Sequence, residues 1–266
     1  MKDKFYIGVD CEGVACAVGR PYEGLGSDSH YQFAQNQAIR EANAAAAALF
    51  EMGAKEVYIW DNHSSGVNFD YNLIDERCKI VMGSGHKVRF PKIDDTFAGV
   101  LFIGYHSRDN VRSAVLAHTY SSKAFQSYSI NGVEVGEMQI DAAFAGEHNV
   151  PVIFVSSDDK TIEQAKETFP WIKCVEIKES LSWNSAISLH PKAACNAIYE
   201  QVKLACKEID TMQSFTFQKP IDVAIRYKRL DEANNAQLFD KTGTPFAFLD
   251  AFTRTGTVKD IYGLSL

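Results

Sequence analysis

The cysteines of this chain lack the spacing of any structural motif. The six thiols, spread over 266 residues, include no C-x-x-C pair. A zinc knuckle needs such closely spaced pairs, and a disulfide framework is typical of short secreted domains. The sequence therefore argues against both of these ways of stabilising a fold, and we interpret the cysteines as ordinary reduced thiols.

An excess of basic charge and long apolar runs are also missing. Lys and Arg number 27 against 34 Asp and Glu, and the resulting formal net charge of -7 argues against a nucleic-acid partner. The first residues, MKDKFYIGVD, contain no apolar stretch long enough for a signal peptide or a membrane span. We therefore expect a protein that works in the cytoplasm and has no membrane partner.

What the chain does contain is a regular alternation of apolar runs and helical patterns. With 46% hydrophobic residues, a chain of 266 residues can bury one large core or two modest ones. The order strand, helix, strand near the N-terminus predicts a parallel unit with a right-handed crossover. We predict an α/β fold with a mostly parallel central sheet flanked by helices. The core is placed at residues 1–210, and a β-rich C-terminal subdomain at 211–266.

The individual elements are predicted from the period of the apolar residues and from turn signals. Asn131-Gly132 is a strong signal for a two-residue hairpin turn. Strands are predicted at 4–9, 57–60, 80–82, 100–103, 115–118, 126–130, 133–135, 152–155, 175–177, 214–218, 221–227 and 245–252. Helices are predicted at 31–51, 136–147, 160–168, 191–209 and 232–239.

Three of the predicted strands end at side chains that can bind a metal. Asp10 and Glu12 follow the first strand at a spacing of two, which directs both carboxylates to one side of an extended backbone. His63 and His106 follow two later strands. Ligands of open α/β sheets gather beyond the carboxyl ends of the strands, so we expect these four side chains to share one cleft. Such ligands suit Zn²⁺, and they also suit Mn, Co or Fe.

Three further charged residues lie close to these motifs. Asp61, two residues before His63, is interpreted as a group that orients a ligand imidazole. Arg108 could meet a substrate carboxylate or carbonyl, and a surface salt bridge explains it equally well. Glu137 falls in the first turn of a predicted helix, where the helix dipole alone favours a carboxylate.

Five short motifs follow one another in order along the chain. They are VDCEG, DNHS, GYHSR, AHTY and VGEMQI. Each alone is common by chance, but the five together, at these separations, resemble the DppA-type D-aminopeptidase family. The segments REANAAAAALFEMGAKEV and FAGVLFIGYH extend the resemblance over nearly the whole chain.

The resemblance implies a dinuclear zinc aminopeptidase that removes an N-terminal D-amino acid from small peptides. It implies a catalytic role for His118 in AHTY. It further implies a ring-shaped homo-oligomer whose active sites face an internal channel. The two Zn²⁺ ions expected per chain would be bound by Asp10, Glu12, His63, His106 and Glu137.

The roles within such a site are only partly fixed by the sequence. Two ions need more ligands than one ion can use, and five protein ligands satisfy this need if Asp10 bridges the ions. His118 can serve as base toward water, as acid toward the leaving amine, or as nucleophile. Two other functions stay open: a metal-dependent amidase or esterase on the same scaffold, and a non-catalytic metal-binding protein.

Overall fold

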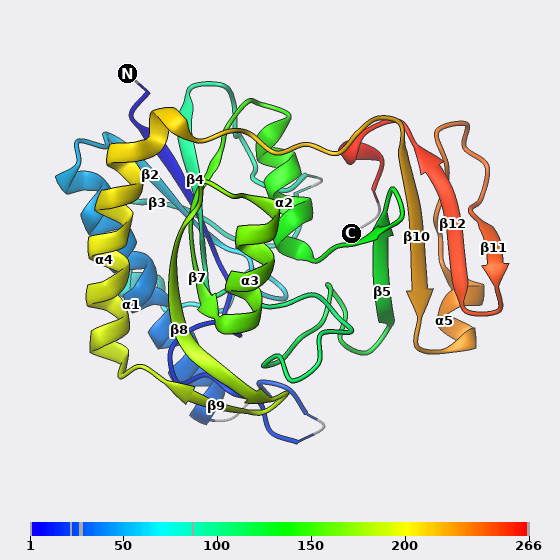
Figure 1. Ribbon diagram of the computed structural model, residues 1–266, viewed down its shortest axis with the longest axis horizontal. Helices are drawn as coiled ribbons and strands as arrows, with labels where there is room; N and C mark the ends of the chain where they lie inside the picture. Colours follow the sequence, from blue (N-terminus) through cyan, green and yellow to red (C-terminus); the bar gives the residue numbers. More distant parts are fainter. Residues whose placement is uncertain (1, 22, 27–28, 87, 265–266) are drawn as a thin grey trace.

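The computed structural model describes residues 2–21, 23–26, 29–86 and 88–264. Within them the chain forms two β-sheets, with helices on both faces of the larger one (Figure 1). None of the described helices is long and apolar enough to cross a lipid bilayer.

The larger sheet has seven strands and is parallel except at one edge. In spatial order the strands are β3 (Lys79–Val81), β2 (Glu56–Asp61), β1 (Lys4–Val9), β4 (Phe97–Ile103), β7 (Val152–Asp158), β8 (Lys173–Ser182) and β9 (Ser185–Ser188). Only β9 pairs with its neighbour in the antiparallel direction. All seven residues of β7 are buried, as expected for a parallel strand covered on both faces. The predicted α/β class is confirmed.

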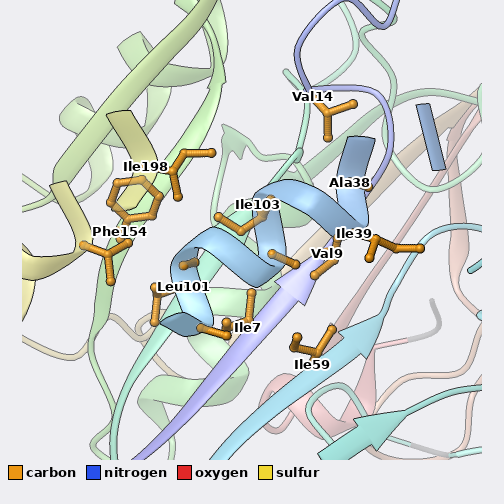
Figure 2. Close-up of a cluster of buried hydrophobic side chains, with 14 of the residues drawn as sticks. Ile7, Val9, Val14, Ala38, Ile39, Ile59, Leu101, Ile103, Phe154 and Ile198 are labelled. Atoms are coloured by element: carbon orange, nitrogen blue, oxygen red, sulfur yellow. The ribbon is translucent and has the colours of Figure 1, made fainter. Parts of the chain in front are cut away.

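Two pairs of helices cover the two faces of this sheet (Figure 1). One face carries α1 (Ser29–Glu51) and α4 (Pro191–Glu208), and the other carries α2 (Glu137–Gly146) and α3 (Asp159–Thr168). Alanines on the inner stripe of α1 allow it to approach the aliphatic side chains of β1 and β4 closely (Figure 2). This packing fixes the central strands, and with them the loops at their carboxyl ends.

The smaller sheet has five strands in the antiparallel order β11-β12-β10-β5-β6. Their bounds are β5 (Phe125–Ile130), β6 (Val133–Glu134), β10 (Ile221–Tyr227), β11 (Ala247–Asp250) and β12 (Thr253–Val258). The predicted β-rich C-terminal region is confirmed, but β5 and β6 come from the segment assigned to the core and pair with β10. The division at residues 210 and 211 therefore stays a prediction, and the sheet draws strands from both sides of it.

Two predicted strands are wrong. Residues 115–118 form no strand, because Leu116 has a left-handed backbone with φ of +52° and cannot continue a ladder. Residues 214–218 have no regular secondary structure and pair with no strand in the described chain, and Phe215 packs against Phe169 at 5.5 Å instead.

The remaining helices are short, and two strands were not predicted. β9 is one of them, and β12 takes up residues just beyond the strand predicted at 245–252. The helix predicted at 232–239 is shorter and begins earlier. The short helices are α5 (Leu230–Asn235), η1 (Tyr71–Leu73), η2 (Ile209–Thr211) and η3 (Ile261–Gly263).

Candidate metal centre

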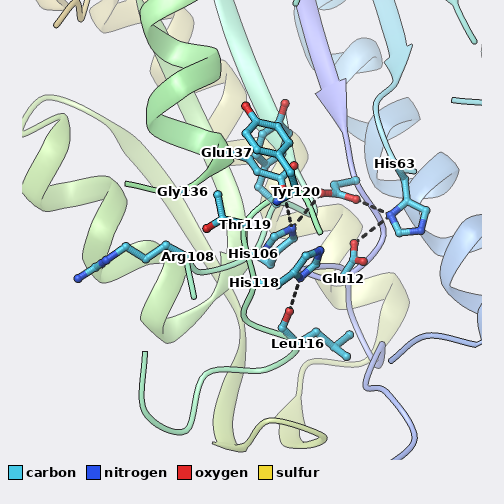
Figure 3. Close-up of polar contacts among 12 residues, drawn as sticks. Glu12, His63, His106, Arg108, Leu116, His118, Thr119, Tyr120, Gly136 and Glu137 are labelled. Carbon is cyan, nitrogen blue, oxygen red and sulfur yellow. Dashed lines mark hydrogen bonds and ion pairs between the residues drawn. The ribbon is translucent and has the colours of Figure 1, made fainter. Parts of the chain in front are cut away.

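The carboxyl ends of β2, β1 and β4, three neighbours in the parallel sheet, meet at the centre of the site. Backbone hydrogen bonds continue the ladders past the strands: Asp10 N donates to Ile103 O at 2.8 Å, and Asn62 N donates to Val9 O at 3.0 Å. The side chains that follow these strands are therefore held at one sheet edge. The structure brings Asp10, Glu12, His63 and His106 together there, as their strand-end positions predict (Figure 3).

Asp10, Glu12 and His63 form the acidic half of the centre. His63 Nδ1 lies 2.7 Å from Asp10 Oδ1 and 3.1 Å from Glu12 Oε2. One oxygen or nitrogen atom from each residue lies within 4.8 Å of the others, close enough for all three to bind one ion. Both carboxylates are buried.

His106, His118 and Glu137 form the imidazole half. His106 Nε2 lies 3.3 Å from Glu137 Oε1, and the two imidazole rings stack at 3.9 Å with 9° between their planes. Here too one possible ligand atom from each residue lies within 4.8 Å of the others. His118, for which the sequence implied a catalytic role, thus lies within reach of the same ion as His106 and Glu137.

Asp10 connects the two halves. Its Oδ1 faces His63, and its Oδ2 lies 3.5 Å from Nε2 of His106. Because its two oxygens point to different imidazoles, Asp10 has the orientation that a carboxylate shared by two ions requires.

Backbone carbonyls fix the orientation of two of the imidazoles. His118 Nδ1 lies 2.7 Å from Leu116 O, and His106 Nδ1 lies 3.1 Å from Ser107 O. A carbonyl can only accept, so each Nδ1 carries a proton, and Nε2 is the ring nitrogen that can act as ligand or base once it is deprotonated. The backbone therefore sets the tautomer that metal binding or proton transfer at Nε2 would need.

The burial of so many ionisable groups shifts their pKa values strongly. Burial, with the charge of Glu12 adding to it, raises the pKa of Asp10 to about 7. Burial also opposes ionisation of Glu12, but the charge of His63 outweighs it and holds the Glu12 pKa well below its usual range. The raised pKa of Asp10 shows that a second ionised carboxylate is unfavourable beside Glu12, a condition that a bound cation relieves.

The imidazole half shows the same opposition of burial and charge. Burial disfavours the charged form of His106, but Glu137 outweighs it and raises the His106 pKa to about 10. The charge of His106 overcomes burial at Glu137 and lowers that pKa to about 2. Burial and the charge of His106 together lower the pKa of His118, so its ring stays neutral.

The donor set fits a metal ion. Glu12 Oε2 is buried and accepts no hydrogen bond from the described residues, although it is close to His63. A buried carboxylate oxygen without a donor is costly unless a cation binds it. Three carboxylates and three imidazoles in one cavity match the mixed oxygen and nitrogen ligands of zinc and related metals.

The loop that carries the acidic half depends on two glycines. At Gly104, φ is +72° and a Cβ atom would lie 2.2 Å from Asp10 O. At Gly13, a Cβ atom would lie 2.1 Å from Tyr105 O. Only glycine allows these backbones to approach so closely, and the approach sets the positions of Asp10 and Glu12.

A buried lysine that the sequence did not reveal secures the same loop. Lys178 Nζ donates to the carbonyls of Glu12 at 2.5 Å, Val14 at 3.0 Å and Ala17 at 2.6 Å. Burial lowers the pKa of Lys178 to about 8. Lys178 follows buried Ile177 in β8, and nothing in the sequence pattern distinguishes it from an exposed strand lysine.

His118 is held by contacts that only the tertiary structure provides. Its backbone N donates to Ser107 O at 3.1 Å, which ties its loop to the end of β4. Tyr120 N donates to Glu137 Oε1 at 2.7 Å, so the loop also binds the first residue of α2. The two contacts thus tie the loop of His118 to the residue after His106 and to Glu137 itself.

Neither Asp61 nor Arg108 forms a hydrogen bond or an ion pair with the metal-binding side chains. Among the described residues, the Asp61 carboxylate accepts from Asn68 N at 2.6 Å and from Tyr71 at 3.2 Å, and not from the imidazole of His63. It therefore orders the loop after β2 and not the ring, so that interpretation is wrong. Arg108 extends away from the centre toward Glu134, 3.9 Å away, as the surface salt bridge interpretation expects (Figure 3).

Both halves open into a cavity of about 340 Å³. Tyr31, Leu116 and Trp183 line it together with the six residues of the centre. A cavity of this size accepts a small ligand and not a folded protein.

Comparison with known proteins identifies the family. Residues 3–246 match the model of the M55 peptidase family, described as D-aminopeptidase. The D-aminopeptidase of Bacillus subtilis (strain 168) is 28% identical over 248 residues, covering 91% of this chain and 89% of the relative. The fold matches that of the Zn-dependent D-aminopeptidase DppA from Bacillus subtilis, a self-compartmentalizing protease, with a TM-score of 0.88 and 24% identity over 98% of this chain and 93% of that one. The chain therefore belongs to the M55 family of D-aminopeptidases.

Proposed function

We propose that this protein is a dinuclear zinc aminopeptidase that removes an N-terminal D-amino acid from short peptides. The observation that carries the proposal is the pair of ligand groups that meet at Asp10, at the carboxyl ends of three parallel strands. Membership of the D-aminopeptidase family supports the reaction, and the zinc dependence of the structurally similar enzyme supports the metal.

The residues divide into two sites that share one carboxylate. Glu12 and His63 would bind one ion, His106 and Glu137 the other, and Asp10 would bridge them. When bound, two such ions polarise the peptide carbonyl and lower the pKa of a water molecule toward neutrality. Mn, Co or Fe would satisfy the same donors, and the zinc-dependent relative favours zinc.

His118 is proposed as the residue that moves the proton. Leu116 O holds its Nδ1–H, and the unprotonated Nε2 is left to accept a proton from the attacking water. Because burial lowers its pKa, the ring is neutral and ready to accept at neutral pH. The imidazolium so formed can donate to the leaving amine, so one residue acts first as base and then as acid.

The acidic half would select the free N-terminus of the substrate. A neutral peptide amine is a good ligand for a divalent ion, and an ion held by Asp10, Glu12 and His63 would lie at the wall of the cavity where that amine could bind. By analogy with the self-compartmentalizing relative, we propose that the protein assembles as a ring-shaped homo-oligomer and works in the cytoplasm.

The experiment that tests the proposal is elemental analysis of protein purified without chelator or affinity tag. The parent should hold about two zinc ions per chain, and the Glu12→Ala and Glu137→Ala variants should each hold fewer. Glu134→Ala is the matched control, because this exposed carboxylate lies close to Glu137 in sequence but contacts Arg108 instead. A parent that holds no metal and cannot be loaded would falsify the proposal.

A substrate screen tests the reaction itself. D- and L-dipeptides should be compared with simple esters on the metal-loaded protein. Preferential hydrolysis of D-residue dipeptides, lost in Glu137→Gln while the circular dichroism spectrum is retained, supports the proposal. Preference for esters would indicate a different metal hydrolase, and metal uptake without any turnover would indicate a binding protein.

A further inference from the structure

A second cavity, of about 500 Å³, adjoins the metal centre. Asn62, Ser64 and Tyr120 line both this cavity and the one that holds the centre, so the two are neighbours separated by no more than these shared residues. The second cavity also has aromatic walls, to which Trp60 and Phe144 contribute. None of the six residues of the centre lines it, and the proposed function assigns it no role.

Arg89 is the cation in the wall of this second cavity. The central carbon of its guanidinium lies over two rings, 4.4 Å from the centroid of Trp60 and 5.7 Å from that of Tyr120. Its Nε and Nη2 donate to the two carboxylate oxygens of Asp141 at 2.6 and 2.8 Å, and Nη2 also donates to Asn62 Oδ1. These contacts fix the plane of the guanidinium before any ligand arrives.

One nitrogen of this guanidinium is left without a partner. No described residue accepts a hydrogen bond from Nη1 of Arg89, and the side chain is 16% exposed. On the side of the protein interior, the Asp141 carboxylate is fully buried and accepts from Tyr105 Oη at 2.6 Å as well as from Arg89. The free donors of Arg89 therefore serve the cavity and not the protein interior.

Arg89 is placed close to both halves of the metal centre. Asn62, which binds its Nη2, precedes His63 of the acidic half. Tyr120, whose ring faces the guanidinium, donates its backbone N–H to Glu137 of the imidazole half. Asn62 and Tyr120 therefore link Arg89 to both halves of the centre, and both residues line the cavity on each side.

The outer wall of the cavity lies beyond the part of the chain that matches the family model. Tyr262 packs edge-on against Phe144 at 5.5 Å, and its hydroxyl lies 3.1 Å from His148 Nε2. The family match ends at residue 246, so this wall is formed by a segment outside it. Tyr262 and Leu264 therefore add to this cavity from outside the family match, and its other walls lie within it.

We propose that Arg89 binds the free carboxylate of a dipeptide substrate, whose second residue occupies the cavity between Trp60, Phe144 and Tyr262. This inference rests on the proposed function and names its substrate class: dipeptides with a free C-terminus and an apolar second residue. The ion of the acidic half would hold the amine and Arg89 the carboxylate, so the two ends of a dipeptide set its direction across the centre.

The test compares D-alanyl-L-phenylalanine with its C-terminal amide on the metal-loaded protein. A hydrogen bond from a charged donor contributes about 1.5–3 kcal/mol, so the parent should prefer the free acid about tenfold to hundredfold in kcat/KM. Arg89→Lys keeps a positive charge beside Asp141 but loses the free Nη1 donors, and this variant should lose most of the preference. Arg108→Lys is the matched control, because Arg108 points away from the centre, and it should keep the preference.

Two outcomes overturn the inference. One is equal kcat/KM for acid and amide in the parent, and the other is an unchanged preference in folded Arg89→Lys. If Arg89→Lys fails to fold, the variant Ser84→Trp provides a second test. Ser84 is exposed and lines the cavity, so a larger side chain at this position would occupy the space proposed for the second residue of the substrate. Ser84→Trp should lower kcat/KM for D-alanyl-L-phenylalanine at least about tenfold more than for D-alanyl-glycine, and equal effects on both overturn the inference.

Failure of the proposed function is recognised separately. If the metal-loaded parent hydrolyses neither probe, the aminopeptidase reaction is wrong, and calorimetric binding of the same two probes then decides the inference. Tighter binding of the acid that Arg89→Lys abolishes supports the carboxylate site. Equal binding of acid and amide, or no binding of either, overturns it.

Discussion

The two halves of the metal centre are built in different ways. Asp10, Glu12 and His63 directly follow two adjacent parallel strands, and a buried lysine and close backbone contacts hold their loop. In the imidazole half, one histidine follows a strand, another lies in an irregular loop, and Glu137 begins a helix.

This difference shows that the two sheets position different residues of the centre. The acidic half depends on the parallel sheet alone, because β1 and β2 are neighbours and their ends coincide. Glu137 follows the β5–β6 hairpin, which belongs to the antiparallel sheet. The position of the imidazole half therefore depends on how the second sheet packs beside the first. Variants that affect only one half of the centre can test whether the two halves are supported independently.

The largest effect is expected from His118→Ala. If His118 moves the proton while the other five residues bind metal, kcat should fall by about 10²–10⁴ and the metal content should stay near two per chain. Initial-rate kinetics measure kcat, and elemental analysis of the same sample measures the metal content. A fall in metal content equal to that of Glu137→Ala would show instead that His118 is a ligand, which its position within 4.8 Å of the other two residues permits.

A smaller effect, confined to the acidic half, is expected from Lys178→Met. Three backbone carbonyls would lose their donor, at about 1–3 kcal/mol for each one left unsatisfied. The loop that positions Glu12 would loosen, and affinity for one of the two ions should fall about tenfold to hundredfold. Chelator competition followed by zinc release distinguishes the ions.

Lys173→Met is the matched control for this experiment. Lys173 lies in the same strand but pairs with Glu208 at the surface. Its replacement should leave both ions bound as in the parent. Equal weakening of both ions in Lys178→Met would contradict the idea that the halves are supported independently.

The smallest effect on activity is expected from Glu41→Gln, which changes how stability depends on pH. Glu41 lies in α1, where its carboxylate accepts from Ala15 N at 2.9 Å in the loop after the acidic half. Burial raises its pKa from 4.5 to about 7. Between these values the folded state binds more protons than the unfolded state, so stability falls as the pH rises from about 4.5 through 7.

The glutamine variant cannot titrate, so it should lose less stability than the parent over this interval. Thermal unfolding at pH 5 and pH 8 should show a smaller decrease of Tm in Glu41→Gln, by a few degrees, on the order of 5 °C. Glu51→Gln, an exposed position of the same helix, is the control and should follow the parent. Parallel Tm curves for Glu41→Gln and the parent would show that Glu41 is ionised in the folded state.

Much of the acidic half could be predicted from the sequence. Short β-branched runs that end in Asp10, Glu12 and His63 define parallel strands, and the carboxyl ends of such strands meet by geometry. The stop of α1 is equally local, because Gly53 adopts a φ of +96° that other residues rarely adopt. The motif order along the chain then identified the family, and the fold class followed from the same alternation.

The rest depends on contacts between distant parts of the chain. The strand predicted at 115–118 is an irregular loop because Leu116 N donates to Trp183 O, 67 positions further on, and not to a neighbouring strand. Arg89 meets Asp141 52 residues away, and nothing in either local sequence indicates the pair.

The sequence by itself thus determined the alternation of strands and helices around the parallel sheet, the ends of its central strands and the chemical types of the side chains placed there. Those properties follow from local periodicity, which each segment carries within itself. Only the tertiary structure decided that His118 and Glu137 meet, that Lys178 supports the loop, and that Arg89 faces a second cavity. These contacts form when whole layers pack against one another, and the free energy of that packing belongs to no single segment.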